Sequence, residues 1–208
     1  MIRIRLETIG KRHQHLWTFR GIDYVFEEKT RTAITGFNGS GKSTLLQIIS
    51  GYQQASEGKI TYTHNTNEVS SEKLFKLLSI GAPYIDLPEE LSIEELITFF
   101  GPFKEFQQGI NTTAFLEISQ LTHAKNKSIK QFSSGMKQRL KLALAILSDT
   151  PLLLLDEPLS NLDANGVSWY KEMIDTYTSQ KTTIVASNNI EDEIFFCTGR
   201  ININDFKK

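Results

Sequence analysis

The chain has 208 residues, of which 39% are hydrophobic and 23% are charged, a composition typical of a soluble folded domain large enough to bury a core. Its formal net charge of −1 argues against a nucleic-acid-binding surface, so we expect no nucleic acid partner. No apolar run approaches the ~18 residues that a membrane-spanning helix needs. The single cysteine, Cys197, excludes an intramolecular disulfide and fits a reducing compartment.

The N-terminal segment has the patterns of β-strands. Ile2, Ile4 and Leu6 alternate with polar residues, as in a strand with one buried face. Residues 16–19 and 22–26 are two further strand-like runs with Gly21 between them. We therefore expect several strands here, arranged as an antiparallel β lobe.

A phosphate-binding loop follows the next predicted strand, residues 31–35. Residues 36–44 read Gly-Phe-Asn-Gly-Ser-Gly-Lys-Ser-Thr and fit the pattern Gly-x-x-x-x-Gly-Lys-Ser/Thr. The glycines let the backbone wrap around an anion, and the amides of residues 38–43 can form a nest for phosphate oxygens. A helix predicted over residues 42–50 directs the positive end of its dipole toward the same anion. The candidate ligands in this loop are Gly36, Asn38, Gly39, Ser40, Gly41, Lys42, Ser43 and Thr44.

Two residues of this loop have the side chains that a nucleotide requires. Lys42 can reach the β- and γ-phosphates, and Ser43 offers a hydroxyl to Mg²⁺. The predicted order of strand, glycine loop and helix is the arrangement in which this motif binds phosphate.

The middle of the chain changes from strands to helices. Short strands are predicted over residues 58–63 and 77–81, and residues 87–147 read as mostly helical. Ser92 and Glu95 have the spacing of a capping box. The last helix of this part starts near Gly135, where Ser133 or Ser134 can cap it, so its N-terminus is a second candidate anion site.

Two carboxylates follow the apolar run of residues 151–155. A carboxylate at the end of such a buried strand can hold Mg²⁺, with Ser43 on the other side, and we assign that role to Asp156. Glu157 then lies where a water would attack the γ-phosphate, so we expect it to act as the general base or to orient the water.

Strands and helices alternate to the end of the chain. Helices are predicted over residues 163–179 and 190–197, and strands over residues 182–187 and 200–203. Such alternation favours a mostly parallel sheet covered on both faces. We expect one α/β domain over residues 1–208, with a helical insertion at roughly 87–147 and the antiparallel β lobe.

Together, these motifs resemble the nucleotide-binding domain of ABC ATPases, which are P-loop NTPases, over essentially the whole chain. Residues 36–44 correspond to Walker A, residues 152–157 to Walker B with its catalytic glutamate, and residues 160–163 to the D-loop ending in Asp163. Residues 132–136 stand at the signature motif. The resemblance implies ATP and Mg²⁺ as ligands and a head-to-tail dimer, in which Ser133, Ser134 and Gly135 face the ATP of the other subunit.

The sequence departs from the family pattern at several positions. Asn188 stands where the family has the switch histidine, and an asparagine donates a hydrogen bond but cannot take up a proton. Tyr84 replaces the Q-loop glutamine, and Ser134 and Met136 replace a glycine and a glutamine of the signature. We therefore expect slow turnover, with Glu157 still essential and Asn188 as a second catalytic candidate that donates to the γ-phosphate. The residue that stacks on adenine is either His13 or Trp17.

The resemblance implies the ATP-hydrolysing subunit of an ABC transporter. Since the chain has no membrane span, we expect a separate integral-membrane permease and a cytoplasmic location, peripheral on the inner face of the cell membrane. An apolar set near the expected docking groove includes Leu87, Leu91, Phe99, Phe100 and Phe103. The alternative is a soluble ABC ATPase, or a slow nucleotide switch, that acts on a cytosolic protein.

Overall fold

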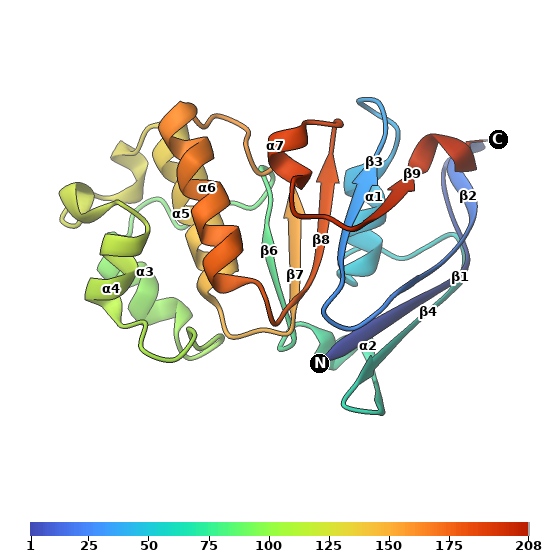
Figure 1. Cartoon of the computed structure of the whole chain (residues 1–208), viewed down its shortest axis with the longest axis horizontal. Helices are drawn as coiled ribbons and strands as arrows, with labels where there is room; N and C mark the ends of the chain where they lie inside the picture. Colours follow the sequence, from blue (N-terminus) through green and yellow to red (C-terminus); the bar gives the residue numbers. More distant parts are fainter. Residues whose placement is uncertain (208) are drawn as a thin grey trace.

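Within residues 1–207, which the computed structural model describes, the strands form two sheets (Figure 1). The larger sheet is parallel, and its strand order is β6-β7-β8-β3-β9. Its strands are short and mostly apolar, as expected for a sheet covered on both faces. Their bounds are β3 (Arg31–Thr35), β6 (Leu78–Gly81), β7 (Leu152–Asp156), β8 (Thr182–Ser187) and β9 (Gly199–Asn202).

The second sheet is the antiparallel lobe that the sequence predicted. Its strand order is β2-β1-β4-β5, with β1 (Ile2–His13), β2 (Leu16–Phe26), β4 (Glu57–His64) and β5 (Asn67–Val69). The prediction of two strands separated by Gly21 was wrong, because β2 runs through this glycine. Gly21 has a φ of +76°, and the β1–β2 register shifts next to the Ile9–Ile22 pair. A glycine at positive φ therefore makes an irregularity in one long strand here and does not end it.

Seven α-helices and three short 3₁₀ segments connect the strands in the described part of the chain. The α-helices are α1 (Lys42–Ile49), α2 (Ser71–Leu74), α3 (Ile93–Phe100), α4 (Thr112–Ile118), α5 (Ser134–Leu147), α6 (Ala164–Tyr177) and α7 (Glu191–Ile194). The predicted capping box at the start of α3 is confirmed by reciprocal hydrogen bonds between Ser92 and Glu95. Figure 1 shows α3 and α4 at the end of the molecule far from the lobe, with α5 and α6 between them and the sheet.

Helix α7 is much shorter than the predicted helix over residues 190–197. The amide of Thr198 donates to the carbonyl of Arg31 (2.9 Å), and Gly199 pairs with Thr32. This pairing draws the chain into β9 beside β3, so the helix ends after one turn.

The two faces of the parallel sheet belong to two different hydrophobic cores. Side chains alternate along each strand, so Leu153, Leu155 and Val185 pack against the core that contains α5 and α6. Leu154 and Ile184 point the other way, into the core that contains α1 and the lobe. Both faces of the sheet are covered, as the alternating pattern of strands and helices indicated.

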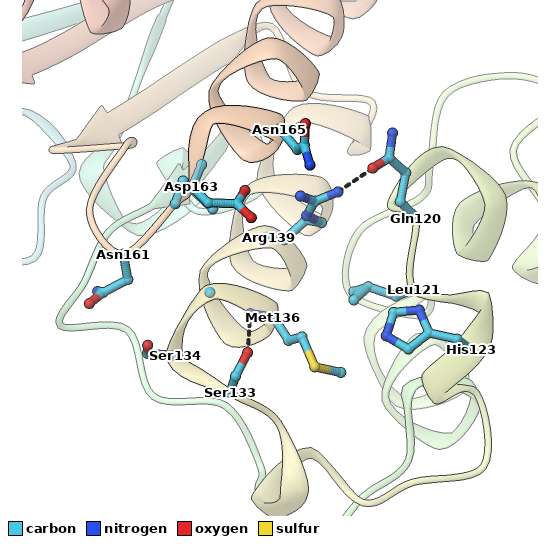
Figure 2. Close-up of a pocket in the computed structure, with 12 residues that line it drawn as sticks. Gln120, Leu121, His123, Ser133, Ser134, Met136, Arg139, Asn161, Asp163 and Asn165 are labelled. Carbon is cyan, nitrogen blue, oxygen red and sulfur yellow. Dashed lines mark hydrogen bonds between the residues drawn. The ribbon is translucent and has the colours of Figure 1, made fainter.

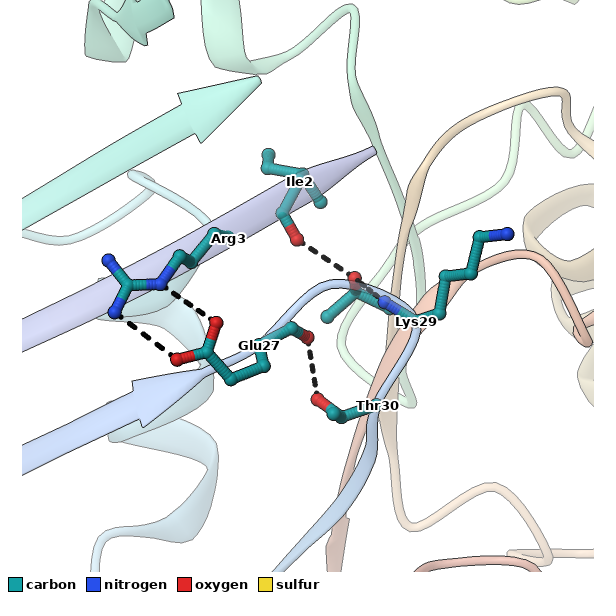
Figure 3. Close-up of polar contacts among 6 residues, drawn as sticks. Ile2, Arg3, Glu27, Lys29 and Thr30 are labelled. Carbon is teal, nitrogen blue, oxygen red and sulfur yellow. Dashed lines mark hydrogen bonds and ion pairs between the residues drawn. The ribbon is translucent and has the colours of Figure 1, made fainter. Parts of the chain in front are cut away.

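A small polar cluster joins the lobe to the parallel sheet (Figure 3). The hydroxyl of Thr182, at the start of β8, donates to the carbonyl of Ile2 (2.9 Å) and accepts from the amide of Lys29 (3.0 Å). Arg3 and Glu27 form a two-pronged ion pair between β1 and the end of β2. These contacts fix the start of β1 and the segment after β2 at the amino-terminal end of the parallel strands, because Thr182 is the first residue of β8.

None of the helices in the described part of the chain is long and apolar enough to cross a membrane.

Candidate nucleotide-binding site

The predicted phosphate loop connects the end of β3 to the start of α1. Gly36, Gly39 and Gly41 all have positive φ, at 152°, 72° and 105°. A Cβ on Gly41 would lie 2.6 Å from Cγ2 of Thr18 and 2.9 Å from Cδ1 of Phe19, so strand β2 packs directly against the loop. Glycine is therefore required at position 41 by both backbone conformation and space.

The ammonium group of Lys42 is held inside this loop. The side chain is only 4% exposed, and Nζ donates to the carbonyl oxygens of Gly36 (3.2 Å) and Phe37 (3.1 Å). It also donates to Oδ1 of Asn188 at 2.5 Å. Burial lowers the pKa of Lys42, while the nearby carboxylates of Glu157 and Asp156 act in the opposite direction. These hydrogen bonds thus fix the ammonium group at a position where it would contact an anion bound in the loop.

Asp156 and Glu157 lie at the carboxyl end of β7, close to the loop. Asp156 is 1% exposed, and burial raises its pKa to about 6, against the effects of the Ser43 hydroxyl and of Lys42. Among the described residues, its Oδ1 atom is buried and has no hydrogen-bond partner. A buried carboxylate oxygen without a donor, next to a serine hydroxyl, is a suitable ligand pair for Mg²⁺.

No cluster of three or more His, Cys, Asp or Glu side chains that could hold a metal ion occurs among residues 1–207. Mg²⁺ commonly takes one or two protein ligands and completes its shell with water and substrate phosphates. Ser43 and Asp156 therefore fit Mg²⁺ bound together with a nucleotide, and they do not fit a metal held by protein ligands alone.

Asn188 connects Lys42 to Glu157. Its Oδ1 accepts from Lys42, and its Nδ2 donates to Oε1 of Glu157 at 2.8 Å. Glu157 has a positive φ of 42°, and its amide donates to the carbonyl of Ala186 (2.9 Å). The structure thus brings the phosphate loop, the end of β7 and the end of β8 together through one hydrogen-bonded series.

Tyr84 lies beside the same carboxylate. Burial raises the pKa of Tyr84, and the negative charge of Asp156 acts in the same direction, whereas a hydrogen bond with Gln47 of helix α1 lowers it. The ring is 39% exposed, so Tyr84 lies between the candidate magnesium ligand and solvent. The position where the family has the Q-loop glutamine therefore carries a phenol that contacts Asp156.

The predicted signature residues line a separate cavity of ≈ 540 Å³ at the start of α5 (Figure 2). Ser133 caps the helix by accepting from the amide of Met136 (3.2 Å). A Cβ on Gly135 would lie 2.9 Å from the carbonyl oxygen of Asn161. The lining residues are Gln120, Leu121, His123, Ser133, Ser134, Gly135, Met136, Arg139, Asn161, Leu162, Asp163 and Asn165, which include none of the phosphate loop.

Asp163 has a structural contact inside this cavity. Its carboxylate accepts from the amide of Gly166 (2.8 Å) and caps helix α6. Arg139 reaches across the cavity to the side chain of Gln120, as Figure 2 shows, and its guanidinium lies 5.0 Å from the centre of the Trp169 ring. The polar side chains of Gln120 and His123 had no sequence signal, because they come from a separate segment that only the fold brings to the start of α5.

The two candidates for adenine stacking differ in their surroundings. His13 is exposed at the hairpin between β1 and β2. Trp17 is half-buried, and its ring lies 5.7 Å from the guanidinium of Arg12 and 4.5 Å from that of Arg20. Both residues therefore stay candidates for stacking on adenine: the ring of Trp17 lies near two cations, and the ring of His13 is exposed.

Comparison with known proteins agrees with this geometry. The sequence profile of the ABC transporter family matches residues 19–160. The lantibiotic transport ATP-binding protein SrtF of Streptococcus pyogenes is 31% identical over 167 residues, which cover 78% of this chain and 69% of SrtF. The ABC transporter ATP-binding protein YybJ of Bacillus subtilis is 29% identical and is covered to 92%, over 97% of this chain.

Solved structures share the fold at lower identity. A putative ABC transporter ATP-binding protein from Pyrococcus furiosus superposes with a TM-score of 0.81 at 19% identity, over 99% of this chain and 100% of that one. A bacterial ABC transporter cassette, solved as a dimer, gives a TM-score of 0.76 at 22% identity, over 92% and 90%. With the profile match over most of its length, the chain belongs to the ABC transporter family, as an ATP-binding ATPase chain of that family.

Proposed function

We propose that this chain binds ATP with Mg²⁺ in the phosphate loop and hydrolyses it slowly, as one ABC ATPase domain formed by residues 1–208. The observation that carries the proposal is the hydrogen-bonded series from Lys42 through Asn188 to Glu157. It connects the one buried ammonium group of the loop to the carboxylate beside it, so a phosphate entering the loop meets both.

Each side chain of the series has a distinct part in the reaction. The amides of residues 38–43 and Lys42 bind the phosphates, and Ser43 and Asp156 hold Mg²⁺, which offsets the negative charge of the phosphate oxygens. Glu157 accepts a proton from the attacking water or orients it. Asn188 donates a hydrogen bond toward the γ-phosphate but cannot accept a proton, and this is the reason for slow turnover.

We also propose that two ATPase chains pair head to tail, as a homodimer or a heterodimer. In this arrangement Ser133, Ser134 and Gly135 face the ATP that is held by the phosphate loop of the other subunit. The support is the open cavity at the start of α5, where Ser133 caps the helix and Gly135 has no side chain to cover the backbone. A helix N-terminus with accessible amides is an anion site.

The pair of ATPase chains would power a separate integral-membrane permease at the inner face of the cell membrane. The support is a groove of ≈ 360 Å³ beside α3, lined in part by Leu87, Phe99 and Phe100. Phe99 and Phe103 are 57% and 61% exposed, and their ring centres are 5.6 Å apart. In contrast, Leu91 and Phe100 pack against the core, so Phe99 and Phe103 are the side chains of this set free for docking.

Affinity purification from native membranes tests the transporter proposal. The tagged chain is extracted in mild detergent, and the expected result is a polytopic membrane protein in stoichiometric yield. Replacing both exposed rings, by Phe99→Ser and Phe103→Ser, should lower that yield without changing the melting temperature. A control with Phe75→Ser changes a third half-exposed ring, on the segment after α2. Recovery from the soluble fraction without a membrane partner would contradict the proposal.

The alternative is a slow nucleotide switch, or a soluble ABC ATPase, acting on a cytosolic protein. It is favoured by Asn188 and Tyr84 at two positions where the family has other residues. Against the switch stands Glu157, which keeps its carboxylate next to Asn188. The same purification separates the two proposals, because a switch is recovered with a soluble partner.

A further inference from the structure

A buried carboxylate outside the predicted motifs contacts both loops that carry the candidate catalytic residues. Glu193 lies in α7, and its side chain is 1% exposed. Its Oε2 accepts a 2.5 Å hydrogen bond from the hydroxyl of Ser187, and its Oε1 accepts from the amide of Leu159 at 3.3 Å. Its backbone carbonyl accepts from the hydroxyl of Tyr170 in α6 (3.0 Å). One side chain thus contacts the end of β8 and the segment after β7.

The two contacts lie next to the catalytic candidates in the chain. Ser187 directly precedes Asn188, and Leu159 follows Glu157 by two residues. Both segments have a residue in the left-handed region, since Glu157 has a φ of 42° and Asn189 a φ of 62°. Asparagine adopts this conformation readily, but it is uncommon for glutamate, so the backbone of Glu157 in particular depends on neighbouring contacts that hold it.

The chemistry of Glu193 suits this restraining role better than a packing role. Burying a carboxylate is unfavourable, and burial raises the pKa of Glu193, as do the negative charges of Glu157 and Asp156. In the described part of the chain, no lysine or arginine pairs with it. A leucine would fill the same space without this penalty, but it could not accept from both Ser187 and Leu159.

We infer that Glu193 is a positioning residue for the ATPase reaction: it fixes the positions of Asn188 and Glu157 relative to each other by accepting hydrogen bonds from Ser187 and Leu159. It acts through these loops and does not touch the nucleotide. The inference rests on the proposed function for its catalytic consequence. The restraint of the two loops does not depend on that function, because it follows from the hydrogen bonds of Glu193.

Amide hydrogen exchange tests the restraint without any need for activity. Glu193→Ala should raise exchange about tenfold or more in residues 157–163 and 187–190, and leave the phosphate loop, residues 36–44, unchanged. Glu191→Gln is the matched control, because Glu191 lies in the same helix and is 82% exposed. Glu193→Gln can accept from Leu159 and donate to Ser187, so it should restore protection. If Glu193→Ala folds poorly, Ser187→Ala removes the contact with Glu193 together with the hydrogen bond from the amide of Ile190 (3.2 Å), so exchange should rise in residues 187–189 as well as at Ile190.

Kinetics test the catalytic consequence. Glu193→Ala should lower kcat about tenfold while the affinity for ATP stays within about twofold, and Glu193→Gln should recover most of kcat. In an Asn188→Ala background, Glu193→Ala should lower kcat by clearly less than it does in the wild-type background, since one of the two residues that it positions is already absent. Additive losses, or unchanged exchange in both loops, would overturn the inference. Absence of hydrolysis by the wild-type chain would instead overturn the proposed function, and the exchange result would still decide the restraint.

Discussion

Replacing Gly41 with alanine should destabilise the chain far more than the same change at Gly39, two residues earlier in the phosphate loop. Both glycines have positive φ, at 105° and 72°, so both substitutions strain the backbone, by about 1–3 kcal/mol. Only Gly41 adds a steric conflict, because its Cβ would lie 2.6 Å from Thr18 and 2.9 Å from Phe19. A Cβ on Gly39 would have no atom of the described residues within 4 Å, apart from its neighbours in the chain. Overpacking at Gly41 adds about 1–3 kcal/mol.

The expected losses are therefore about 2–6 kcal/mol for Gly41→Ala and about 1–3 kcal/mol for Gly39→Ala. Equilibrium unfolding in urea measures both, and the melting temperature of Gly41→Ala should fall by about 10 °C. ATP affinity should also fall in Gly41→Ala, because the relief of the conflict moves the loop away from β2. Equal destabilisation by the two variants would refute the packing of β2 against this loop.

Three other changes have definite expected outcomes. Asn188→His should raise kcat or leave it unchanged, since histidine can take up the proton that asparagine cannot; a large loss in a hydrolysis assay would show that Asn188 itself is a specialised partner. Asp163→Ala should lower the unfolding free energy by about 1 kcal/mol, and Asp163→Asn by less, because the carboxylate caps α6; equal losses in urea titrations would argue against the cap. Lys181 is 5% exposed, and burial lowers its pKa from 10.5 to about 8, so the unfolded chain binds more protons between these values and stability should rise with pH by about 3 kcal/mol. Burial also lowers the pKa of Lys104 to about 8, so Lys181→Met should remove only the share of Lys181, and exposed Lys127→Met should leave the rise unchanged, as denaturation at pH 8 and 10.5 will show.

The strand–loop–helix unit could be predicted because its signals are local. The spacing of the glycines in residues 36–44 and the apolar runs on either side need no long-range contact to be recognised. The position of Asp156 at the end of a buried strand followed from the run of leucines before it. Parallel strands have their carboxyl ends on the same side of the sheet, so the carboxyl ends of β3, β7 and β8 were expected to lie together, as the structure confirms.

The errors in the predicted fold come from pairing between distant segments. Gly21 has the appearance of a turn between two strands, but pairing with β1 continues on both sides of it. The helix predicted over residues 190–197 has adequate local propensity, yet pairing of Gly199 with Thr32 ends it early. Neither partner strand can be identified from the segment itself.

The parts of the site that sequence reasoning missed are buried polar and packing contacts. Glu193 occurs in the acidic stretch Glu191-Asp192-Glu193, which has the pattern of an exposed helix start. Only the fold shows that its carboxylate turns inward to Ser187 and Leu159. Similarly, nothing in β2 indicates that Thr18 and Phe19 pack against Gly41.

The role of Glu157 is tested most directly by comparing ATP binding and ATP hydrolysis in the wild-type chain and in Glu157→Gln. Glutamine keeps the volume of the side chain and can still accept from Nδ2 of Asn188, but it cannot take up a proton. The account predicts that the affinity for ATP with Mg²⁺ is retained and that kcat falls by about 10²–10⁴-fold. Hydrolysis by Glu157→Gln at the wild-type rate would contradict the central claim that this carboxylate activates the attacking water.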